Sequence, residues 1–195
     1  MPLPFTSKGH MKNTPLIETN RLILKPLVSE DAKQIQRLFP RWEIVRYLVD
    51  SIPWPYPDTA AQYYVDHIAL EESRKGHRWF WTIRRKEDTE ILIGAISLMV
   101  TEDNNRGFWL VPEWQNQGYM TEACNAVTAF WFEELGQTVL RAPKAVTNIP
   151  SKKLSMRSGM RLIRTELSDY VSGRLETEIW EMTREEWLKS LTFRK

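Results

Sequence analysis

The sequence predicts a single domain of mixed α/β class, in which helices cover both faces of one sheet. The length of 195 residues suits one domain with a sizeable core. Apolar residues make up 42% of the chain and charged residues 27%, which are the proportions of an ordinary globular protein. The order of the elements indicates the class, because strands separated by short turns give way to alternating strands and helices after residue 121. No internal repeat or linker splits the chain.

The N-terminal part holds one strand, two amphipathic helices and, between these, a short helical piece over residues 42–49. Residues 21–27 roughly alternate polar and apolar side chains, which is the strand pattern. Ser29 caps a first helix, and Asp58 caps a longer second helix that Gly76 ends. Residues 51–57 lie between the helices and carry three prolines, so they form an extended loop.

The middle of the chain is typical of an antiparallel meander. Residues 78–84 alternate along a strand, and residues 90–100 form a longer apolar strand. The polar residues 101–105 make a turn, and residues 106–111 form the next strand. We expect these consecutive strands to pair antiparallel, because short turns join them.

The C-terminal part alternates strand and helix, which is the pattern of crossover units. Gly136 closes the first helix of this part, and Gly159 closes the second. A turn at Ser172-Gly173 joins the two final strands. The predicted elements are a helix over residues 121–135, a strand over 139–146, a helix over 150–158, and strands over 160–167 and 175–183.

Composition argues against several classes of protein. The single cysteine, Cys124, cannot form an internal disulfide, so we expect a reducing compartment and a cytoplasmic protein. No stretch of about 18 apolar residues is present, so we expect no membrane span. The charges are scattered and sum to a formal net charge of +2. Nucleic-acid binding therefore has little support, despite a pI of about 8.6.

The first residues stand apart from the predicted domain. They lack the basic-then-apolar order of a secretory signal. Gly9-His10-Met11 is interpreted either as the remnant of an expression tag or as native sequence. We therefore expect an N-terminal extension or tag remnant over residues 1–13 and the functional domain over residues 14–190.

The predicted chemistry lies in residues 107–123, where a strand runs through a polar loop into a helix. Successive backbone N–H groups in such a loop point at one spot, and the helix dipole adds about half a positive charge there. This predicts a pyrophosphate site of backbone groups, which Gly118 lets the anion approach closely. A triphosphate-binding loop needs a lysine followed by serine or threonine, and this segment has none. A dinucleotide-binding loop needs three glycines, and this loop has only Gly118. A plain strand-to-helix connection remains the alternative.

The same loop resembles that of a known family. Gln115-Asn116-Gln117-Gly118-Tyr119-Met120 is similar to the coenzyme A loop of the GCN5-related N-acetyltransferase (GNAT) superfamily. The family pattern is Gln or Arg, two residues, Gly, one residue, then Gly or Ala. Further short motifs resemble the branch that acetylates the N-termini of ribosomal proteins, and together they cover residues 16–188. They are Glu18 to Leu24, Ile93 to Ile96, Phe108 to Leu110, Thr121 to Ala123, Asn148 to Ser151, Ser158 to Met160, Gly173-Arg174 and Glu185 to Trp187.

The resemblance implies a GNAT-like domain with a mostly antiparallel, twisted sheet that splays between its fourth and fifth strands. It also implies acetyl-CoA as the cosubstrate and Ser151 as the group that protonates the departing thiolate. Asn148 would bond or place the pantetheine arm, and the backbone groups of Trp109 and Leu110 would pair with that arm. The pyrophosphate would be held by the backbone amides of Asn116, Gln117, Gly118, Tyr119, Met120 and Thr121.

Two positions depart from the family pattern. Met120 stands where the loop pattern has glycine or alanine, so we expect a more crowded helix start. Ser155 stands where many members of the superfamily have a tyrosine, seven residues after Asn148. The proton for the thiolate would then come from Ser151, Ser155 or water. Ser151 also fits a structural role in the first turn of its helix, next to Pro150.

The general base is not singled out by spacing. Glu102, Asp103 and Glu113 lie near the edge of the predicted cofactor strand, and each is also interpreted as a solvated surface carboxylate. Glu122, at a helix start, would serve the helix dipole. A base acting through water is an equal alternative, and we expect direct transfer without an acyl-enzyme.

Other reactive or aromatic residues have structural interpretations. Cys124 fits a small buried residue of the core. Trp54 and Tyr56, on the proline-rich loop, either line the acceptor pocket or pack in the core. We expect no metal, because the histidines lack metal-ligand spacing. These histidines are His10, His67 and His77.

The loop and the resemblance together predict an acetyl-CoA-dependent N-acetyltransferase that moves the acetyl group directly to a primary amine. The amine belongs to a protein N-terminus or to a small molecule. A non-catalytic acyl-CoA-binding sensor or scaffold module is the alternative, which the missing tyrosine and the unassigned base favour. Acetyl-CoA and the acceptor are the expected partners, with no nucleic acid and no membrane, for a monomer or a homodimer. Acetyl and longer acyl groups both remain open.

Overall fold

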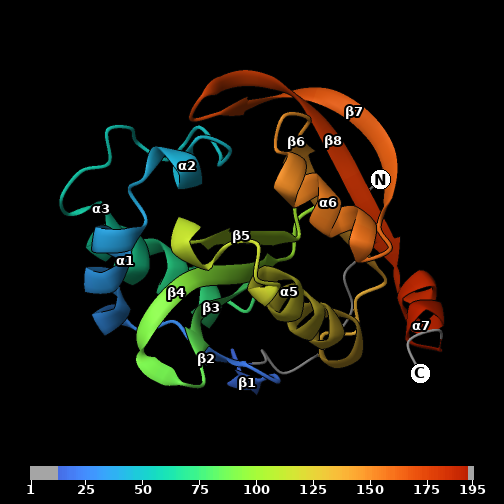
Figure 1. The fold of residues 1–195 in the computed structure, drawn as a ribbon, viewed down its shortest axis with the longest axis horizontal. Coiled ribbons are helices and arrows are strands. Elements are labelled where there is room, and N and C mark those ends of the chain that lie inside the picture. The colour runs from blue at the N-terminus through green and yellow to red at the C-terminus, as the bar shows by residue number, and fades with distance from the viewer. Residues whose placement is uncertain (1–12, 193–195) are drawn as a thin grey trace.

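The computed structural model describes residues 13–192 (Figure 1). Apart from Asn13, the extension predicted for residues 1–13 lies outside the described residues. The strands are β1 (Ile17–Glu18), β2 (Leu22–Pro26), β3 (Arg78–Arg85), β4 (Asp88–Met99), β5 (Arg106–Leu110), β6 (Val139–Ala145), β7 (Arg161–Tyr170) and β8 (Gly173–Thr183). They form two antiparallel sheets, one in the order β1-β2-β3-β4-β5 and one in the order β6-β8-β7.

The helices lie close to their predicted positions. The long helix predicted between Asp58 and Gly76 consists of two α-helices joined by a π-helical turn at Val65–Ala69. The helix predicted over residues 121–135 begins two residues earlier and ends in a second π-helical turn, Phe130–Glu134. The helices are α1 (Ala32–Leu38), α2 (Trp42–Val45), α3 (Ala60–Tyr64), α4 (Leu70–Arg74), α5 (Tyr119–Ala129), α6 (Ile149–Arg157) and α7 (Arg184–Thr192).

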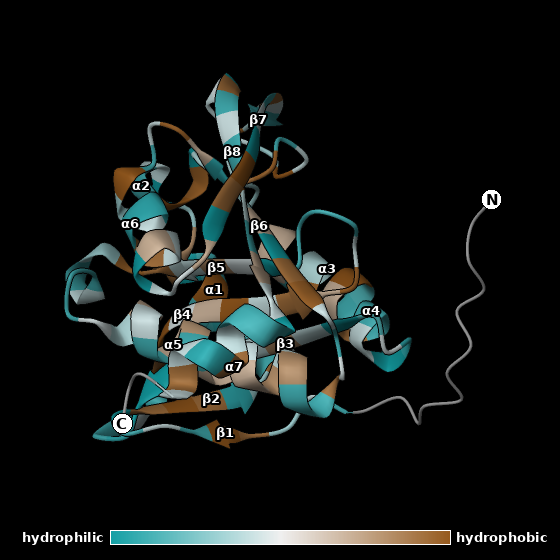
Figure 2. Ribbon diagram, turned by 90° about the vertical axis from the view of Figure 1, so that its right-hand side faces the viewer, coloured by the Kyte–Doolittle hydropathy of each residue, from teal (hydrophilic) through white to brown (hydrophobic). Residues whose placement is uncertain are grey.

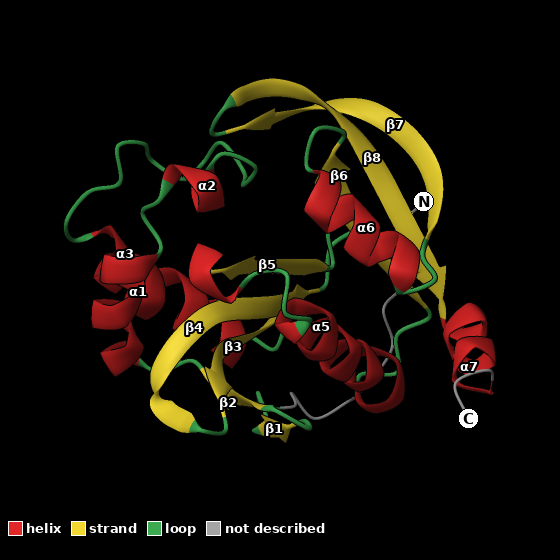
Figure 3. Ribbon diagram, viewed as in Figure 1, coloured by secondary structure: helices red, strands yellow, loops and turns green. Residues whose placement is uncertain are grey.

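The helices cover both faces of the first sheet, as the order of strands and helices in the sequence predicts. In β2, Leu22 and Leu24 are fully buried and pack in one core cluster with Val127 of α5. Figure 2 shows the apolar residues of β2 in brown. A second cluster joins Ile35 of α1 to Leu92 of β4. The two clusters place α5 on one face of the sheet and α1 to α3 on the other (Figure 3).

The two sheets meet at one point and then diverge. Asn105 donates its backbone N–H to the Arg141 carbonyl at 2.8 Å, and its side-chain oxygen accepts the Arg141 N–H at 2.7 Å. Pro143 lies on the same edge of β6, two residues further on, and it has no N–H with which to continue the pairing. We call the region beyond the Asn105–Arg141 contact, where β5 and β6 are no longer paired, the splay.

The splay agrees with the predicted sheet once the short edge strand β1 is counted. The prediction placed it between the fourth and fifth strands, and with β1 included it lies between β5 and β6. The predicted crossover is also present, because β6 and β7 run parallel on either side of β8 with α6 between them in sequence. The two final strands are longer than predicted, since they pair up to a tight turn after Tyr170.

Candidate functional site

The polar loop between β5 and α5 turns through two left-handed residues. Asn116 has φ 60° and Gly118 has φ 83°, a backbone region that favours glycine and tolerates asparagine. Gly118 is the N-cap of α5, and its carbonyl accepts the Glu122 N–H at 3.0 Å. The amides of residues 119–121 precede that first bond, so they have no partner inside the helix. The loop therefore presents N–H donors and the positive end of a helix dipole at one place.

A network around Glu122 fixes the start of α5 against β2. The Glu122 carboxylate accepts the Thr19 hydroxyl at 2.6 Å, the Arg21 backbone N–H at 2.7 Å and Arg21 Nε at 2.8 Å. Arg21 also donates Nη1 to the Gln117 carbonyl at 3.0 Å, and its guanidinium lies over the Tyr119 ring. Burial raises the pKa of the Glu122 carboxyl, but these hydrogen bonds outweigh it and hold the pKa below its ordinary value. Glu122 is thus an ionised anchor of the loop.

Met120 does not crowd the loop in the way that its bulk predicts. Its side chain is 9% exposed and packs in the core cluster with Leu110. The Met120 side chain therefore points into the core and does not cover the N–H groups of the first turn of α5. The loop accommodates methionine because the helix start already lies against the core.

The register of β5 decides which backbone groups face the splay. The Val111 N–H donates to the Ile93 carbonyl at 2.9 Å, and Trp109 pairs with Ala95 of β4. Because backbone groups alternate in direction along a strand, those of Trp109 face β4, and those of Phe108 and Leu110 face the splay. The Leu110 carbonyl accepts Gln115 Nε2 at 2.8 Å. The two strand residues predicted for the pantetheine arm are thus separated, and only Leu110 presents its backbone to the splay.

Asn148 and Ser151 lie at the start of α6. Asn148 is the N-cap, and its side-chain oxygen accepts the Ser151 N–H at 3.4 Å. Ser151 is 8% exposed, and among residues 13–192 its hydroxyl has no hydrogen-bond partner. Ser155, one turn further on, is fully buried, and its hydroxyl also has no partner in the described part of the chain. Both hydroxyls are therefore free to donate a proton.

The carboxylates considered as bases carry other interactions. Glu113 pairs with Arg41 at 2.6 Å, and the hydrogen bond from Arg41 lowers the pKa of the Glu113 carboxyl. Asp103 pairs with Arg164 at 2.6 Å, and this hydrogen bond lowers the pKa of the Asp103 carboxyl. Glu102 is exposed. Lowered pKa values make Glu113 and Asp103 poorer proton acceptors.

A strap of chain closes the far side of the splay. The tip of the β7–β8 hairpin contacts the segment after α2, where the Val171 N–H donates to the Leu48 carbonyl at 3.0 Å (Figure 3). The Tyr47 hydroxyl donates to the Thr147 carbonyl at 3.2 Å. These contacts join the first sheet's helices to the second sheet across the open end.

The two aromatic residues of the proline-rich loop have different environments. Tyr56 packs edge-on against Phe39 at 5.2 Å between ring centroids, and it is a partly buried residue packed against the second core cluster. Burial, and then the neighbouring Tyr64, raise the pKa of Tyr56 to about 12. Trp54 is 41% exposed and lies against Trp42, at 5.6 Å between ring centroids. Tyr56 is therefore half-buried at the edge of the core, whereas Trp54 is on the surface.

Two buried cations near the splay were missed by sequence reasoning. Arg106 is 2% exposed, and Lys144 is 7% exposed with its ammonium 4.5 Å from the centre of the Phe108 ring. Burial, and then the charge of Arg106, lower the pKa of Lys144 to about 7. The burial of Lys144 could have been predicted from the sequence, because Lys144 continues the inward-facing series of Leu140 and Ala142 along β6.

The described residues show neither a metal-binding cluster nor a membrane-spanning helix. No group of three or more histidine, cysteine, aspartate or glutamate side chains within residues 13–192 is arranged to hold a metal ion. None of the helices in that same part of the chain is long and apolar enough to cross a membrane.

Comparison with known proteins places this site in a family. A model of the acetyltransferase (GNAT) domain matches residues 21–161. The uncharacterized N-acetyltransferase YoaA of Bacillus subtilis is 29% identical over an alignment of 155 residues, which covers 75% of this chain and 83% of that protein. The FsC-acetyl coenzyme A-N(2)-transacetylase of Aspergillus fumigatus is 29% identical over an alignment of 194 residues, which covers 92% of this chain and 80% of that protein.

The fold of the chain is also similar to that of solved acetyltransferase structures. The structure of Mycobacterium smegmatis RimJ in complex with CoA-disulfide superposes with a TM-score of 0.74 at 16% identity, covering 85% of this chain and 83% of that one. The chain belongs to the GNAT acetyltransferase family. It is an acetyltransferase enzyme that uses acetyl-CoA as donor.

Proposed function

We propose that this enzyme transfers the acetyl group of acetyl-CoA directly to a primary amine of a protein N-terminus or a small molecule. The observation that carries the proposal is that the splay and the N–H groups at the start of α5 lie at the same end of β5. The splay opens beyond the Asn105–Arg141 contact, and it leads to the N–H groups at the start of α5. Such a site suits a long ligand with an anionic group at one end and a neutral arm at the other.

The residues around the splay fit a coenzyme A molecule. The backbone amides of residues 116–121 would hold the pyrophosphate, with Gly118 allowing its close approach. The backbone groups of Phe108 and Leu110 face the splay and would pair with the pantetheine arm. Asn148, at the start of α6, would bond the arm from the other side of the splay. Trp109 would contribute its side chain, which packs on Phe39 at 5.3 Å between ring centroids, on the acceptor side of β5.

The chemistry requires a proton donor and an oxyanion donor from the chain. Acetyl-CoA supplies the acetyl thioester. A backbone N–H on the open edge of β5 would stabilise the oxyanion that develops on attack. The unpartnered Ser151 hydroxyl would give its proton to the departing thiolate. A base acting through water would take the proton of the amine, because the lowered pKa values of Asp103 and Glu113 make both carboxylates poor direct acceptors.

The first test is a calorimetric titration with acetyl-CoA, followed by thiol release against a panel of amines and N-terminal peptides. Binding with thiol release is the expected result, and the best amine would identify the acceptor class. Binding without release on any amine would contradict transfer and favour the sensor module. Absence of binding would overturn the loop assignment.

Ser151→Ala should slow turnover more than it weakens acetyl-CoA binding. Loss of a positioned proton donor costs about 10²-fold or more in kcat. The Kd for acetyl-CoA should change little, because Asn148 still caps the helix through the backbone N–H of residue 151. The matched control is Ser155→Ala, the same truncation one turn along α6. A larger loss of kcat in Ser155→Ala would move the donor role to Ser155, and equal losses of kcat and binding in Ser151→Ala would make Ser151 structural.

A further inference from the structure

Arg106, the first residue of β5, is a buried cation without an ionic partner. It is 2% exposed, and no carboxylate among residues 13–192 forms an ion pair with it. Nη1 donates to the Thr128 hydroxyl oxygen at 2.8 Å, while that hydroxyl gives its own proton to the Cys124 carbonyl at 2.6 Å. Nη2 lies 3.5 Å from the sulfur of Met160, which is a weak acceptor. Nε has no partner at all in the part of the chain that is described.

The other fully buried arginine shows what a satisfied guanidinium looks like in this protein. Arg84 is 3% exposed and pairs with Asp31 at 2.5 Å. It also donates to the carbonyls of Thr89 and Glu90 at 2.8 and 2.7 Å, and to the Thr82 hydroxyl at 3.2 Å. A buried charge with a carboxylate and several acceptors is tolerated, whereas one left uncompensated is strongly destabilising. Arg106 therefore needs an acceptor that its protein neighbours do not provide.

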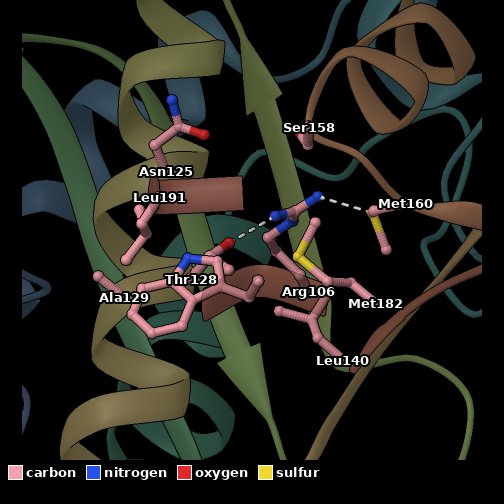
Figure 4. A pocket seen from close by; sticks show the side chains of 10 residues that line it. Arg106, Asn125, Thr128, Ala129, Leu140, Ser158, Met160, Met182 and Leu191 are labelled. Carbon is pink, nitrogen blue, oxygen red and sulfur yellow. Dashed lines mark hydrogen bonds between the residues drawn. The ribbon is translucent and has the colours of Figure 1, made fainter. Parts of the chain in front are cut away.

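A cavity of about 70 Å³ adjoins this guanidinium. In Figure 4 the Arg106 guanidinium lies at the centre of the ring of lining side chains, between Thr128 on one side and Met160 on the other. Asn125 and Ser158 add polar groups, and Asn125 is exposed, so it lies at the mouth of the cavity. The remaining lining residues are apolar, and none of the ten is acidic. They are Ala129, Leu140, Met160, Met182, Trp187 and Leu191.

The titratable groups nearby add positive charge and no negative charge. The buried ammonium of Lys144 is close enough for Arg106 to lower its pKa. Burial raises the pKa of the Cys124 thiol more than these two cations lower it, so the thiol stays neutral. The interior between α5, β5 and β6 thus holds two cations, and no carboxylate of residues 13–192 pairs with either.

We propose that this cavity binds a small monovalent anion of the size of chloride, held by the Arg106 guanidinium. Arg106 lines the cavity and Lys144 does not, so one negative charge balances the charge at the cavity wall. Charge-assisted N–H donors are the strong anion ligands of proteins. A single water needs only about 10–15 Å³, so the cavity has room for the anion and one or two waters. The apolar walls favour a singly charged, weakly hydrated ion over phosphate.

This site is distinct from the proposed pyrophosphate loop. Asn125 lies seven residues along α5 from Gly118, which is about 10 Å at the helical rise of 1.5 Å per residue. Arg106 also stands at the closed end of β5, next to the Asn105–Arg141 contact, whereas the loop follows the open end. The anion would tie α5 to the end of α6 and to α7, because residues of all three helices or their ends line the cavity.

Thermal unfolding in sodium chloride and in sodium gluconate, at equal ionic strength and with saturating coenzyme A, tests this proposal. Gluconate is too large for the cavity, and coenzyme A occupies the loop. At a chloride concentration about 20 times Kd, the Tm should be higher in chloride by about 4 °C or more. Equal Tm values in the two salts would overturn the proposal and leave water as the occupant.

The variant Arg106→Met keeps the length of the side chain and removes its charge. It should lose the difference between chloride and gluconate, and the matched control Arg164→Met, at an exposed arginine of β7, should keep it. An undiminished difference in Arg106→Met would contradict the assignment. If Arg106→Met does not fold, bromide-soaked crystals of the unaltered protein decide. An anomalous peak beside the Arg106 guanidinium supports the site, and a map without one overturns it.

Discussion

Gly118→Trp should abolish coenzyme A binding while the chain still folds. Gly118 has φ 83°, and a Cβ added there would lie 3.3 Å from Nη2 of Arg21. A left-handed conformation costs a residue with a side chain about 1–2 kcal/mol, and the indole would displace Arg21 from the Gln117 carbonyl. Two charge-assisted hydrogen bonds lost from the pyrophosphate would cost about 3–6 kcal/mol, which is a 10²- to 10⁴-fold weaker Kd. Calorimetric titration measures the change.

The matched control is Gly136→Trp, just beyond the π-helical turn that ends α5. Gly136 also has a left-handed φ, of 65°, and a Cβ there meets no atom within 4 Å. It should therefore cost a similar amount of stability and leave the Kd for coenzyme A unchanged. If Gly118→Trp bound as tightly as Gly136→Trp, the loop would not be the pyrophosphate site.

Local patterns were enough to predict most of the fold. Residues 21–27 and 106–111 follow strand periodicity and became β2 and β5 within a residue or two, because each alternates within a short window. The loop before α5 was predicted from one glycine and its neighbours, and the left-handed φ of Gly118 fits that reading. Family resemblance supplied the splay, since no local pattern reports that two strands fail to pair.

The details of the site depend on contacts between distant parts of the chain. Glu122 was interpreted as a partner of the helix dipole, whereas its carboxylate is held by Thr19 and Arg21, about a hundred residues away in sequence. The backbone of Trp109 was assigned to the pantetheine arm, and only the register with β4 shows that it faces the other way. Periodicity shows which side chains share a face of a strand, but it does not show which N–H groups face the splay. The partners of Glu122 and the direction of the Trp109 backbone therefore did not follow from the sequence.

Lys144→Met should stabilise the fold at neutral and acidic pH and lose that advantage as the pH rises. The folded-state pKa of Lys144 is lowered to about 7 by burial and by Arg106, against about 10.4 in an unfolded chain. Between these values the unfolded chain binds a proton that the folded chain does not, so this lysine makes stability rise with pH. Below pH 7 both states are charged, and the full penalty of the buried ammonium remains.

The shift from about 10.4 to about 7 corresponds to a penalty of up to about 5 kcal/mol in the free energy of unfolding. We therefore expect Lys144→Met to be more stable than the unaltered chain by up to about 5 kcal/mol at pH 6, with the difference approaching zero near pH 10. Urea unfolding of both proteins across that pH range gives the two curves.

Lys152→Met is the matched control, because Lys152 pairs with Glu178 at 2.9 Å and carries no unpaired buried charge. It should be no more stable than the unaltered chain at pH 6, and its difference should not shrink between pH 7 and 10. A Lys144→Met curve that ran parallel to that of the unaltered protein over this range would show that the ammonium is solvated. The buried positive charge beside the splay would then be that of Arg106 alone.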